Sequence, residues 1–301
     1  MSAEVLESYE RSVVDEVQRW VNREPTWSDQ LLGGMSDRSR EVLDIVLRTE
    51  WGRRTLRMAT ERAFGALEGV VLRGLADEGE AALVPTDPQE REAVLRRADE
   101  RAGELRSLYV GALAAQGALV GAASLTWARS VAAIVADVAL AVLVTLRASA
   151  HHLAVYGVAS SQPSVLQASV ELVAVATESD PAVRKQQILV LSRGLRENRQ
   201  AGDLDRELPR VVIQQTSSRA VKEAVEHTVR RVMGGRMTGL VPVLGAAAGG
   251  AASGWLGAQV CDAARQVGRV TFLALHTPLP VNEVLGIGPE VAATSRTGVF
   301  R

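Results

Sequence analysis

Two segments of the sequence carry the same sparse set of ionisable residues: an aspartate, then arginine, then a histidine fourteen residues after the aspartate. The first set is Asp137, Arg147 and His151, and the second is Asp262, Arg265, Arg269 and His276. Because an α-helix turns by about 100° per residue, each set falls on one face of a helix. Carboxylates and imidazoles that share a face can bind cations or transfer protons. These residues are therefore the first candidates for a functional site.

The same arrangement also predicts a structural contact between two helices. If the two faces meet, Asp137 would pair with Arg265 or Arg269. Asp262 would pair with Arg147 in the same contact, so that charges in an apolar setting neutralise one another. We interpret the residues first in this way, as a polar contact that sets helix register. The alternative is a ligand-binding site that comprises Asp137, Arg147, His151, Tyr156, Asp262, Arg265 and Arg269.

An enzyme is the alternative at the level of function, either metal-dependent or hydrolytic, using Asp137, His151 and Asp262. The motifs that usually accompany such chemistry are absent from the sequence, which has no His-x3-His, His-Glu-x-x-His, Gly-x-Ser-x-Gly or Gly-x4-Gly-Lys. The adjacent His151 and His152 would point about 100° apart on a helix. The sequence therefore predicts no catalytic residue, no metal ligand and no cofactor.

Charge and cysteine content narrow the class of protein further. Lys and Arg number 34 against 35 Asp and Glu, a net charge of −1, so no basic field predicts a nucleic-acid partner. Cys261 is the single cysteine, which excludes an intramolecular disulfide and suits a reducing compartment. The N-terminus is acidic where an export signal would be basic and then apolar. We therefore expect a cytoplasmic protein.

The elements that position these residues are predicted to be helices. The apolar residues are mainly Ala, Val and Leu, and they recur every three or four positions without any long alternating pattern. Asp87 and Pro88 have the types expected of an N-cap and a first helical residue. The fold class is therefore all-α. We predict one domain over 1–276, with amphipathic helices in 1–104 and central apolar helices in 105–160 and 236–276, followed by an extended or mobile tail over 277–301.

Two stretches without charge, 107–128 and 237–261, are long enough to cross a bilayer, which takes about 20 residues. Both consist largely of Ala and Gly, and Asp137 in the next helix would cost about 2.5–3.5 kcal/mol at mid-bilayer. We therefore expect a closely packed helical pair within a globular protein. The small residues that would allow this packing stand four apart, at Gly117/Gly121, Gly245/Gly249 and Gly250/Gly254.

Several short motifs resemble those of the EcsC protein family. They are Tyr9-Glu10 and Trp20 in the opening helix, Ala136-Asp137, Leu146-Arg147 and Val155-Tyr156-Gly157 in the first apolar block, and Pro242, Gly245-Ala246 and Gly249 in the second. The sequence departs from the family pattern at Val138 and Ala139, where a Pro is expected nearby, and at Ser253, where an Asn is common. The resemblance covers about residues 5–275. It implies a bacterial, wholly helical protein and supplies no set of catalytic residues.

The family is named for a gene that lies beside the components of an ABC-type exporter. The resemblance and the apolar centre together favour a non-enzymatic protein that works at or near a membrane. The expected partner is a membrane surface, a lipid or a transporter component. The expected role is as an accessory to ABC-type transport or as a binder of an apolar, lipid-like ligand.

Overall fold

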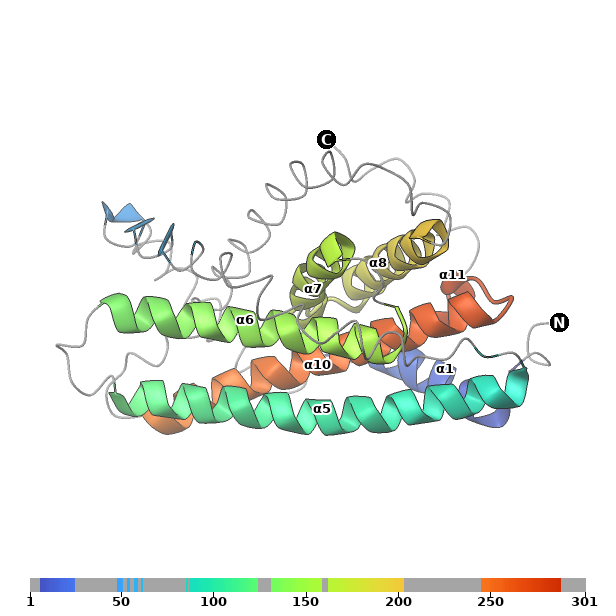
Figure 1. Ribbon diagram of the computed structural model, residues 1–301, viewed down its shortest axis with the longest axis horizontal. Helices are drawn as coiled ribbons and strands as arrows, with labels where there is room; N and C mark the ends of the chain where they lie inside the picture. Colours follow the sequence, from blue (N-terminus) through green and yellow to red (C-terminus); the bar gives the residue numbers. More distant parts are fainter. Residues whose placement is uncertain are drawn as a thin grey trace.

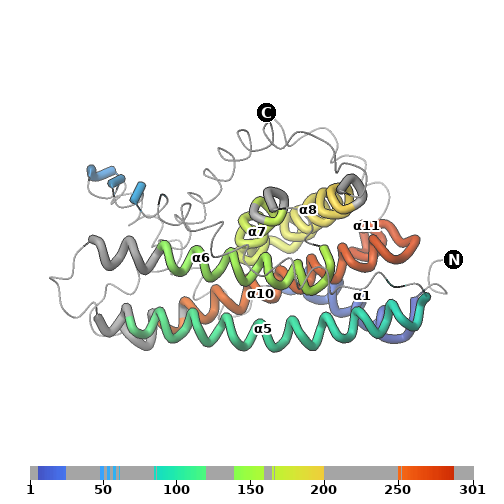
Figure 2. The backbone as a smooth tube through the Cα atoms, viewed as in Figure 1, coloured from blue at the N-terminus to red at the C-terminus, as the bar shows by residue number. Residues whose placement is uncertain are grey.

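The computed structural model consists of helices joined by turns in the part of the chain that it describes (Figure 1, Figure 2). It describes residues 6–24, 48–50, 53–54, 57–58, 61, 85, 87–123, 131–158, 162–202 and 245–287. The helices are α1 (Ser8–Val21), α5 (Pro88–Ala123), α6 (Val131–Val155), α7 (Gln162–Ala176), α8 (Pro181–Gly202), α10 (Gly245–His276) and α11 (Val281–Val284). No strand occurs in these ranges, and the all-α prediction is confirmed.

The three long helices α5, α6 and α10 lie side by side and form the body of the molecule (Figure 1). α5 and α10 are antiparallel, because Arg106 in the middle of α5 contacts Asp262 in the middle of α10, whereas Asp99 nearer the start of α5 contacts Arg269 nearer the end of α10. α6 also runs antiparallel to α5 (Figure 1). Residues far apart in the sequence are thereby brought to the same level of the bundle.

Glycines on α10 allow its backbone to approach α5 closely. A Cβ on Gly250 would lie 3.1 Å from the carbonyl oxygen of Ala114, and one on Gly254 would lie 3.2 Å from the Ala114 Cβ. A Cβ on Gly257 would lie 2.7 Å from a methyl group of Leu113. The predicted close packing is confirmed for Gly250/Gly254, while the pairs Gly117/Gly121 and Gly245/Gly249 include side chains outside the described set.

Two helices begin with the same local device, an aspartate followed by proline. Asp87 Oδ1 accepts a hydrogen bond of 2.8 Å from the backbone N–H of Glu90 at the start of α5. Asp180 Oδ1 accepts one of 2.8 Å from Ala182 at the start of α8. These carboxylates satisfy backbone N–H groups that have no partner within the helix. The predicted N-cap at Asp87 is confirmed.

The shorter helices cover one half of the long bundle (Figure 1). α1 places Val13, Val17 and Val21 in the core, one helical turn apart, as its amphipathic pattern predicts. α7 and α8 contribute buried Leu172 and Ile188 to the same apolar cluster, which also includes residues of α5, α10 and α11. A single core therefore joins the N-terminal helix to the C-terminal ones.

Arg184 of α8 fastens the end of α1 to this core. Its guanidinium donates to the backbone carbonyl oxygen of Glu178, at 2.7 Å from Nη2, and to that of Arg23, at 3.0 Å from Nη1. It also donates to the carbonyls of Trp20 and Val21, each at 3.4 Å. The last carbonyls of a helix lack partners within it and carry its negative end. A buried cation at that place satisfies both needs.

The polypeptide after α10 packs onto the body of the protein through residue 287. Residues 281–284 form the single turn α11, and Val281, Val284 and Leu285 are buried. Gln18 of α1 donates a hydrogen bond of 3.2 Å to the Val284 carbonyl. The prediction that an extended tail begins at 277 is therefore wrong, because the apolar side chains within 279–287 are buried in the core. Residues 288–301 lie outside the described set, and the single domain over 1–276 stays a prediction.

None of the helices in the described ranges combines the length and the apolar character needed to cross a membrane.

Candidate functional site

A buried charged group that contacts several helices is Asp99 of α5. Its Oδ1 accepts hydrogen bonds from the Tyr156 hydroxyl at 2.5 Å and from Arg269 Nε at 2.7 Å. Its Oδ2 accepts from the Tyr9 hydroxyl at 2.6 Å and from Arg269 Nη2 at 3.0 Å. Arg265 Nε lies 3.5 Å from Oδ1. We call these five residues the Asp99 network.

The Asp99 network joins four segments of the chain. Tyr9 comes from α1, Asp99 from α5, Tyr156 from the residue that follows α6, and Arg265 and Arg269 from α10. Arg269 Nη1 also contacts Glu16 of α1 at 2.8 Å, which gives the arginine a second carboxylate. Buried charges are costly unless they are paired and fully hydrogen-bonded. In the Asp99 network, the buried charges are both paired and hydrogen-bonded by other side chains of the protein.

The protonation states in the network follow from its geometry. Burial alone would raise the pKa of Asp99. The hydrogen bond and the charge of Arg269, together with the hydrogen bonds from Tyr156 and Tyr9, lower this pKa by more than burial raises it, so the pKa lies below its ordinary value. Burial and then the hydrogen bond to Asp99 raise the pKa of Tyr9 to about 12. Burial also raises the pKa of Tyr156 well above its ordinary value. At neutral pH Asp99 is therefore a carboxylate, Tyr9 and Tyr156 are neutral phenols, and Arg269 is a charged guanidinium.

A second buried ion pair joins α1 to α5 at Glu10, the residue that follows Tyr9. Glu10 accepts from Arg91 of α5 through both of its oxygens, at 2.5 Å from Nε and 2.9 Å from Nη2. Arg91 Nη1 donates to the carbonyl oxygen of His276, the last residue of α10, at 3.2 Å. Glu10 also accepts from the backbone N–H of Glu7 in a capping box. This pair secures the start of α1 against both α5 and α10.

A third polar group contains both adjacent histidines of α6. The Tyr109 hydroxyl lies 2.9 Å from His151 Nδ1, and His152 Nδ1 lies 2.7 Å from the carbonyl oxygen of Ala148. Because a carbonyl only accepts, His152 carries its proton on Nδ1. Burial lowers the pKa of His152 to about 4, and burial raises that of Cys261 to about 12. The imidazole and the thiol are therefore both neutral at physiological pH.

The His152 imidazole should make stability depend on pH. Its folded-state pKa, about 4, lies below the ordinary value of 6.5, so the unfolded chain takes up the proton first. The stability contributed by the neutral ring is fully present above pH 6.5 and is lost as the pH falls towards 4. The loss amounts to about 1.4 kcal/mol per pH unit, or about 2 kcal/mol at pH 5.

This dependence is measured by urea unfolding of the wild type and of His152→Gln at pH 7.5 and pH 5. The variant should lose less stability than the wild type between these two values. Burial also lowers the pKa of His276, and that contribution remains in both proteins. Equal losses in the two proteins would mean that His152 is not held neutral.

Of the predicted arginines on α10, Arg269 is buried and Arg265 is partly buried, and both contact a residue that sequence reasoning did not single out. Arg265 and Arg269 contact Asp99 of α5. Their pairing with Asp137 stays a prediction. The side chain of Asp137 lies outside the described set. Asp262, for which the sequence predicted Arg147, is bound instead by Arg106 of α5, at 2.7 Å and 3.2 Å. The contacts to Asp99 and Arg106 have one cause, which is that α5 faces this stripe of α10.

Of the other predicted site residues, Tyr156 belongs to the Asp99 network and His151 contacts Tyr109. Sequence reasoning missed Asp99 and the Glu10–Arg91 pair. Asp99 stands in a run of charges that is typical of an exposed helix face. The sequence did contain a signal that Asp99 is buried. Leu95 stands four residues before it and Ala102 three residues after it, so all three lie on the same, buried face of the helix.

The arrangement is suited to holding helices together. The carboxylates of Asp99, Glu10 and Asp262 are each bound by at least one arginine of another helix. Among the described residues, no group of three or more His, Cys, Asp or Glu side chains is placed to hold a metal ion. These carboxylates therefore form ion pairs between helices, and their charges are neutralised by arginines.

These features define an all-α protein whose N-terminal helix is secured to a long three-helix body by buried ion pairs. The chain belongs to the EcsC protein family, whose model matches residues 12–273. The match includes four of the five residues of the Asp99 network, all but Tyr9. No curated protein and no solved structure matches the chain.

Proposed function

We propose that this protein is a non-enzymatic helical protein that acts at the cytoplasmic surface of a membrane. The observation that supports this function is a division of charge along the three long helices. Arg106 is the last charged residue of α5, and it is bound to Asp262, the first charged residue of α10. The charged parts of the two helices therefore end at the same level of the bundle. Beyond it, 107–123 and 245–261 carry no charge, and 131–146 of α6 carries Asp137 alone. We call these three segments the low-charge end.

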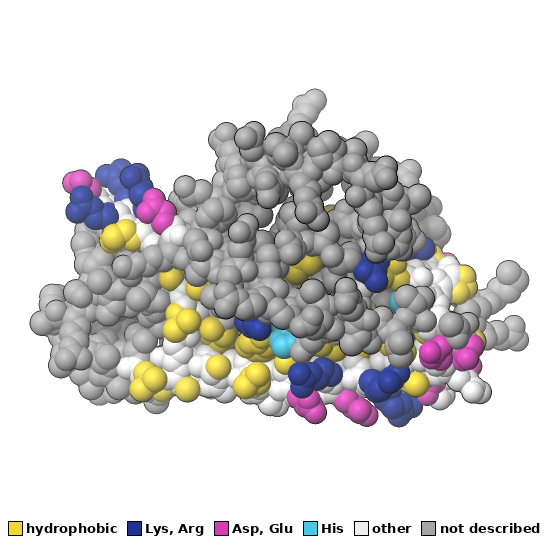
Figure 3. Space-filling view, viewed as in Figure 1, with side chains coloured by type: hydrophobic (Ala, Val, Ile, Leu, Met, Phe, Trp, Pro, Cys, Tyr) yellow, Lys and Arg dark blue, Asp and Glu magenta, His cyan; other side chains and the backbone are white. Residues whose placement is uncertain are grey.

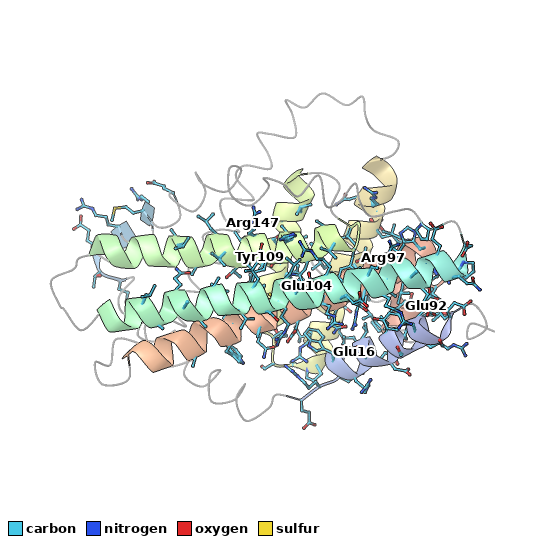
Figure 4. The ribbon with its side chains drawn as sticks, turned by 60° about the horizontal axis from the view of Figure 1, so that its bottom comes forward. Glu16, Glu92, Arg97, Glu104, Tyr109 and Arg147 are labelled. Carbon is cyan, nitrogen blue, oxygen red and sulfur yellow. The ribbon has the colours of Figure 1, made fainter. Side chains whose placement is uncertain are left out.

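Charge is otherwise dense on α5. Figure 4 shows Glu92, Arg97 and Glu104 following one another along its first half, with Tyr109 beyond them and Arg147 of α6 near the level of Tyr109. The surface of a water-soluble protein is normally covered by charges of both signs. A helical body that carries charge on one half and almost none on the other favours contact with an apolar medium or partner at the second half.

The contacts of the acidic and histidine residues support a non-enzymatic role. Asp262 is engaged by Arg106, and His151 by Tyr109. A general acid, base or metal ligand needs a side chain that faces a substrate or an ion. The alternative of a hydrolytic or metal-dependent enzyme at Asp137, His151 and Asp262 gains no such support from the described residues.

The proposed partner is a membrane surface, and the proposed process takes place at that membrane. The EcsC family takes its name from a gene beside the components of an ABC-type exporter, which makes transport the process that we favour. A lipid-like ligand held by the low-charge end would use the same apolar surface. Both versions place lipid in contact with 107–123 or its neighbours.

Flotation of the full chain with lipid vesicles tests this function. The protein should rise with phosphatidylcholine vesicles, or with vesicles that also contain phosphatidylglycerol, and should stay at the bottom of the gradient without them. Mass spectrometry of the native protein would detect a lipid ligand that purifies with it. Absence of the protein from the floating fraction for both vesicle types, together with absence of a bound lipid, would contradict the proposal.

A further inference from the structure

The low-charge end exposes a patch of apolar side chains on two neighbouring helices. On α5, Leu108 is 63% exposed and Leu119 is 72% exposed, while Leu140 on α6 is 50% exposed. Ala112 and Ala115 are exposed between the two leucines of α5. Positions 108, 112, 115 and 119 fall on one face of a helix. We call Leu108, Ala112, Ala115, Leu119 and Leu140 the apolar patch.

Figure 3 shows this distribution on one face of the molecule. Hydrophobic side chains gather over the second half of α5 and the part of α6 beside it, and Lys, Arg, Asp and Glu side chains gather over the first half of α5. The same outward face of α5 carries exposed Arg97, Arg101 and Glu104 before it becomes apolar at Leu108. Charge therefore borders the patch at one end, along the helix axis.

A second arginine stands near that border on α6. Arg147 is half-buried and lies one helical turn before His151, which contacts Tyr109. Arg101 of α5 is exposed and forms an ion pair with Glu104. Long arginine side chains can extend along an apolar surface and keep the guanidinium in a polar layer. The border is thus suited to lipid headgroups, with the patch on the acyl side of it.

The chemistry of the patch favours lipid over a protein partner. Its five side chains are Leu and Ala, so none of them donates or accepts a hydrogen bond. Protein interfaces carry about one hydrogen bond per 100–200 Å² and a polar rim around the apolar centre. An amphipathic surface in the membrane interface needs an apolar face and a charged border and no specific partner.

We infer that the apolar patch on α5 and α6 is the face that rests in the boundary between headgroups and acyl chains of a bilayer. The charged first half of α5 then stays among the headgroups and in water. This inference rests on the proposed function, because it names the surface that makes the membrane contact. It commits to a lipid bilayer as the occupant, and a second copy of this chain is the occupant that the test must distinguish.

Flotation of single variants of the full chain tests the inference. Leu119→Glu should lower the vesicle-bound fraction about tenfold relative to the wild type, because one leucine loses its apolar contact. Val190→Glu is the matched control, since Val190 is 48% exposed on α8, outside the patch. The control should float as the wild type does. Both sites are exposed, so circular dichroism should report a folded protein for each.

A fluorophore reports which face enters the lipid. Cys261 is buried, and its thiol has a raised pKa of about 12, so a thiol-reactive dye should label the introduced cysteine of Leu119→Cys selectively. Dye at position 119 should shift to the blue and be quenched by spin-labelled lipids when vesicles are added. Dye on Arg97→Cys, on the charged half of α5, should show neither change.

Each outcome decides between the alternatives. If the wild type floats with neither vesicle type and carries no bound lipid, the proposed function fails. If it carries a lipid but does not float, the inference alone is wrong. If the wild type floats and Leu119→Glu floats as well as Val190→Glu does, the membrane contact lies elsewhere and the inference is wrong. If light scattering shows a dimer that Leu119→Glu separates, and dye at 119 is not quenched by lipid, a second copy covers the patch and the inference is again overturned.

Discussion

Replacing Asp99 by alanine should lower the free energy of unfolding by about 3–5 kcal/mol. The change removes the carboxylate that binds Arg269 through both Nε and Nη2, and it leaves the guanidinium in the core. The side chain of Arg269 is only 1% exposed, so water cannot replace the lost partner. The hydroxyls of Tyr9 and Tyr156 lose their acceptor at the same time. Urea unfolding followed by circular dichroism measures the loss.

Arg101→Ala is the matched control for this prediction. It removes an ion pair with Glu104 that is half or more exposed on both sides, at 50% and 68%. Exposed pairs contribute less than about 1 kcal/mol. If Asp99→Ala costs no more than this control, Arg269 has found another counter-charge and the network does not hold the helices as described.

A double variant separates the effect of the paired charges on stability from the effect of the side-chain volume. Asp99→Leu combined with Arg269→Met replaces both charges by apolar side chains. Because such replacements of buried pairs are often neutral or stabilising, the double variant should recover more than half of the stability lost in Asp99→Leu alone. Additive losses from the two changes would contradict the assignment of Asp99 as the partner of Arg269.

Gly268→Ala should be nearly as damaging, at about 3–5 kcal/mol. A Cβ on Gly268 would lie 2.3 Å from Cδ2 of the Tyr156 ring, and 2.9 Å from its Cγ. The ring is buried, and its hydroxyl is held by Asp99 at 2.5 Å, so it cannot turn aside without breaking that hydrogen bond. Thermal and urea unfolding measure the loss, and the near-ultraviolet spectrum reports the displaced tyrosine.

Gly103→Ala on α5 gives the opposite expectation for the same chemical change. Among the described residues, no atom beyond the backbone of the same helical turns and the two adjacent residues lies within 4 Å of a Cβ placed there. Because alanine favours the helix more than glycine does, this variant should gain up to about 1 kcal/mol. In a background of Tyr156→Leu, the cost of Gly268→Ala should shrink. An unchanged cost in that background would mean that the ring is not the obstacle.

The sequence was most informative about local structure and about which residues are buried. The positions of Asp87 and Pro88 predicted the start of α5, and the low charge around Arg265 and Arg269 predicted that they lie in a core. These inferences depend on short-range periodicity and on the cost of burying charge. Both can be evaluated from one segment at a time.

The pairing of buried charges could not be obtained in the same way. Helical arithmetic places Arg269 on a face, and it does not say whether α5 or α6 meets that face or in which axial register. Asp99 and Asp137 were equally suitable by residue type. The glycines at 250, 254 and 257 decide the matter, because they bring α10 against α5 and so bring Arg269 to the level of Asp99.

The contacts of α1 have a consequence for biosynthesis. Glu10, Glu16 and the end of α1 are bound by Arg91, Arg269 and Arg184, all of which come later in the chain than α1. A ribosome therefore releases α1 well before the helices that hold it. Since the partner of Glu16 lies near the end of α10, the nascent helix must wait for most of the polypeptide. We expect α1 to be among the last of the described helices to reach its native place, with its valine face open to chaperones until then.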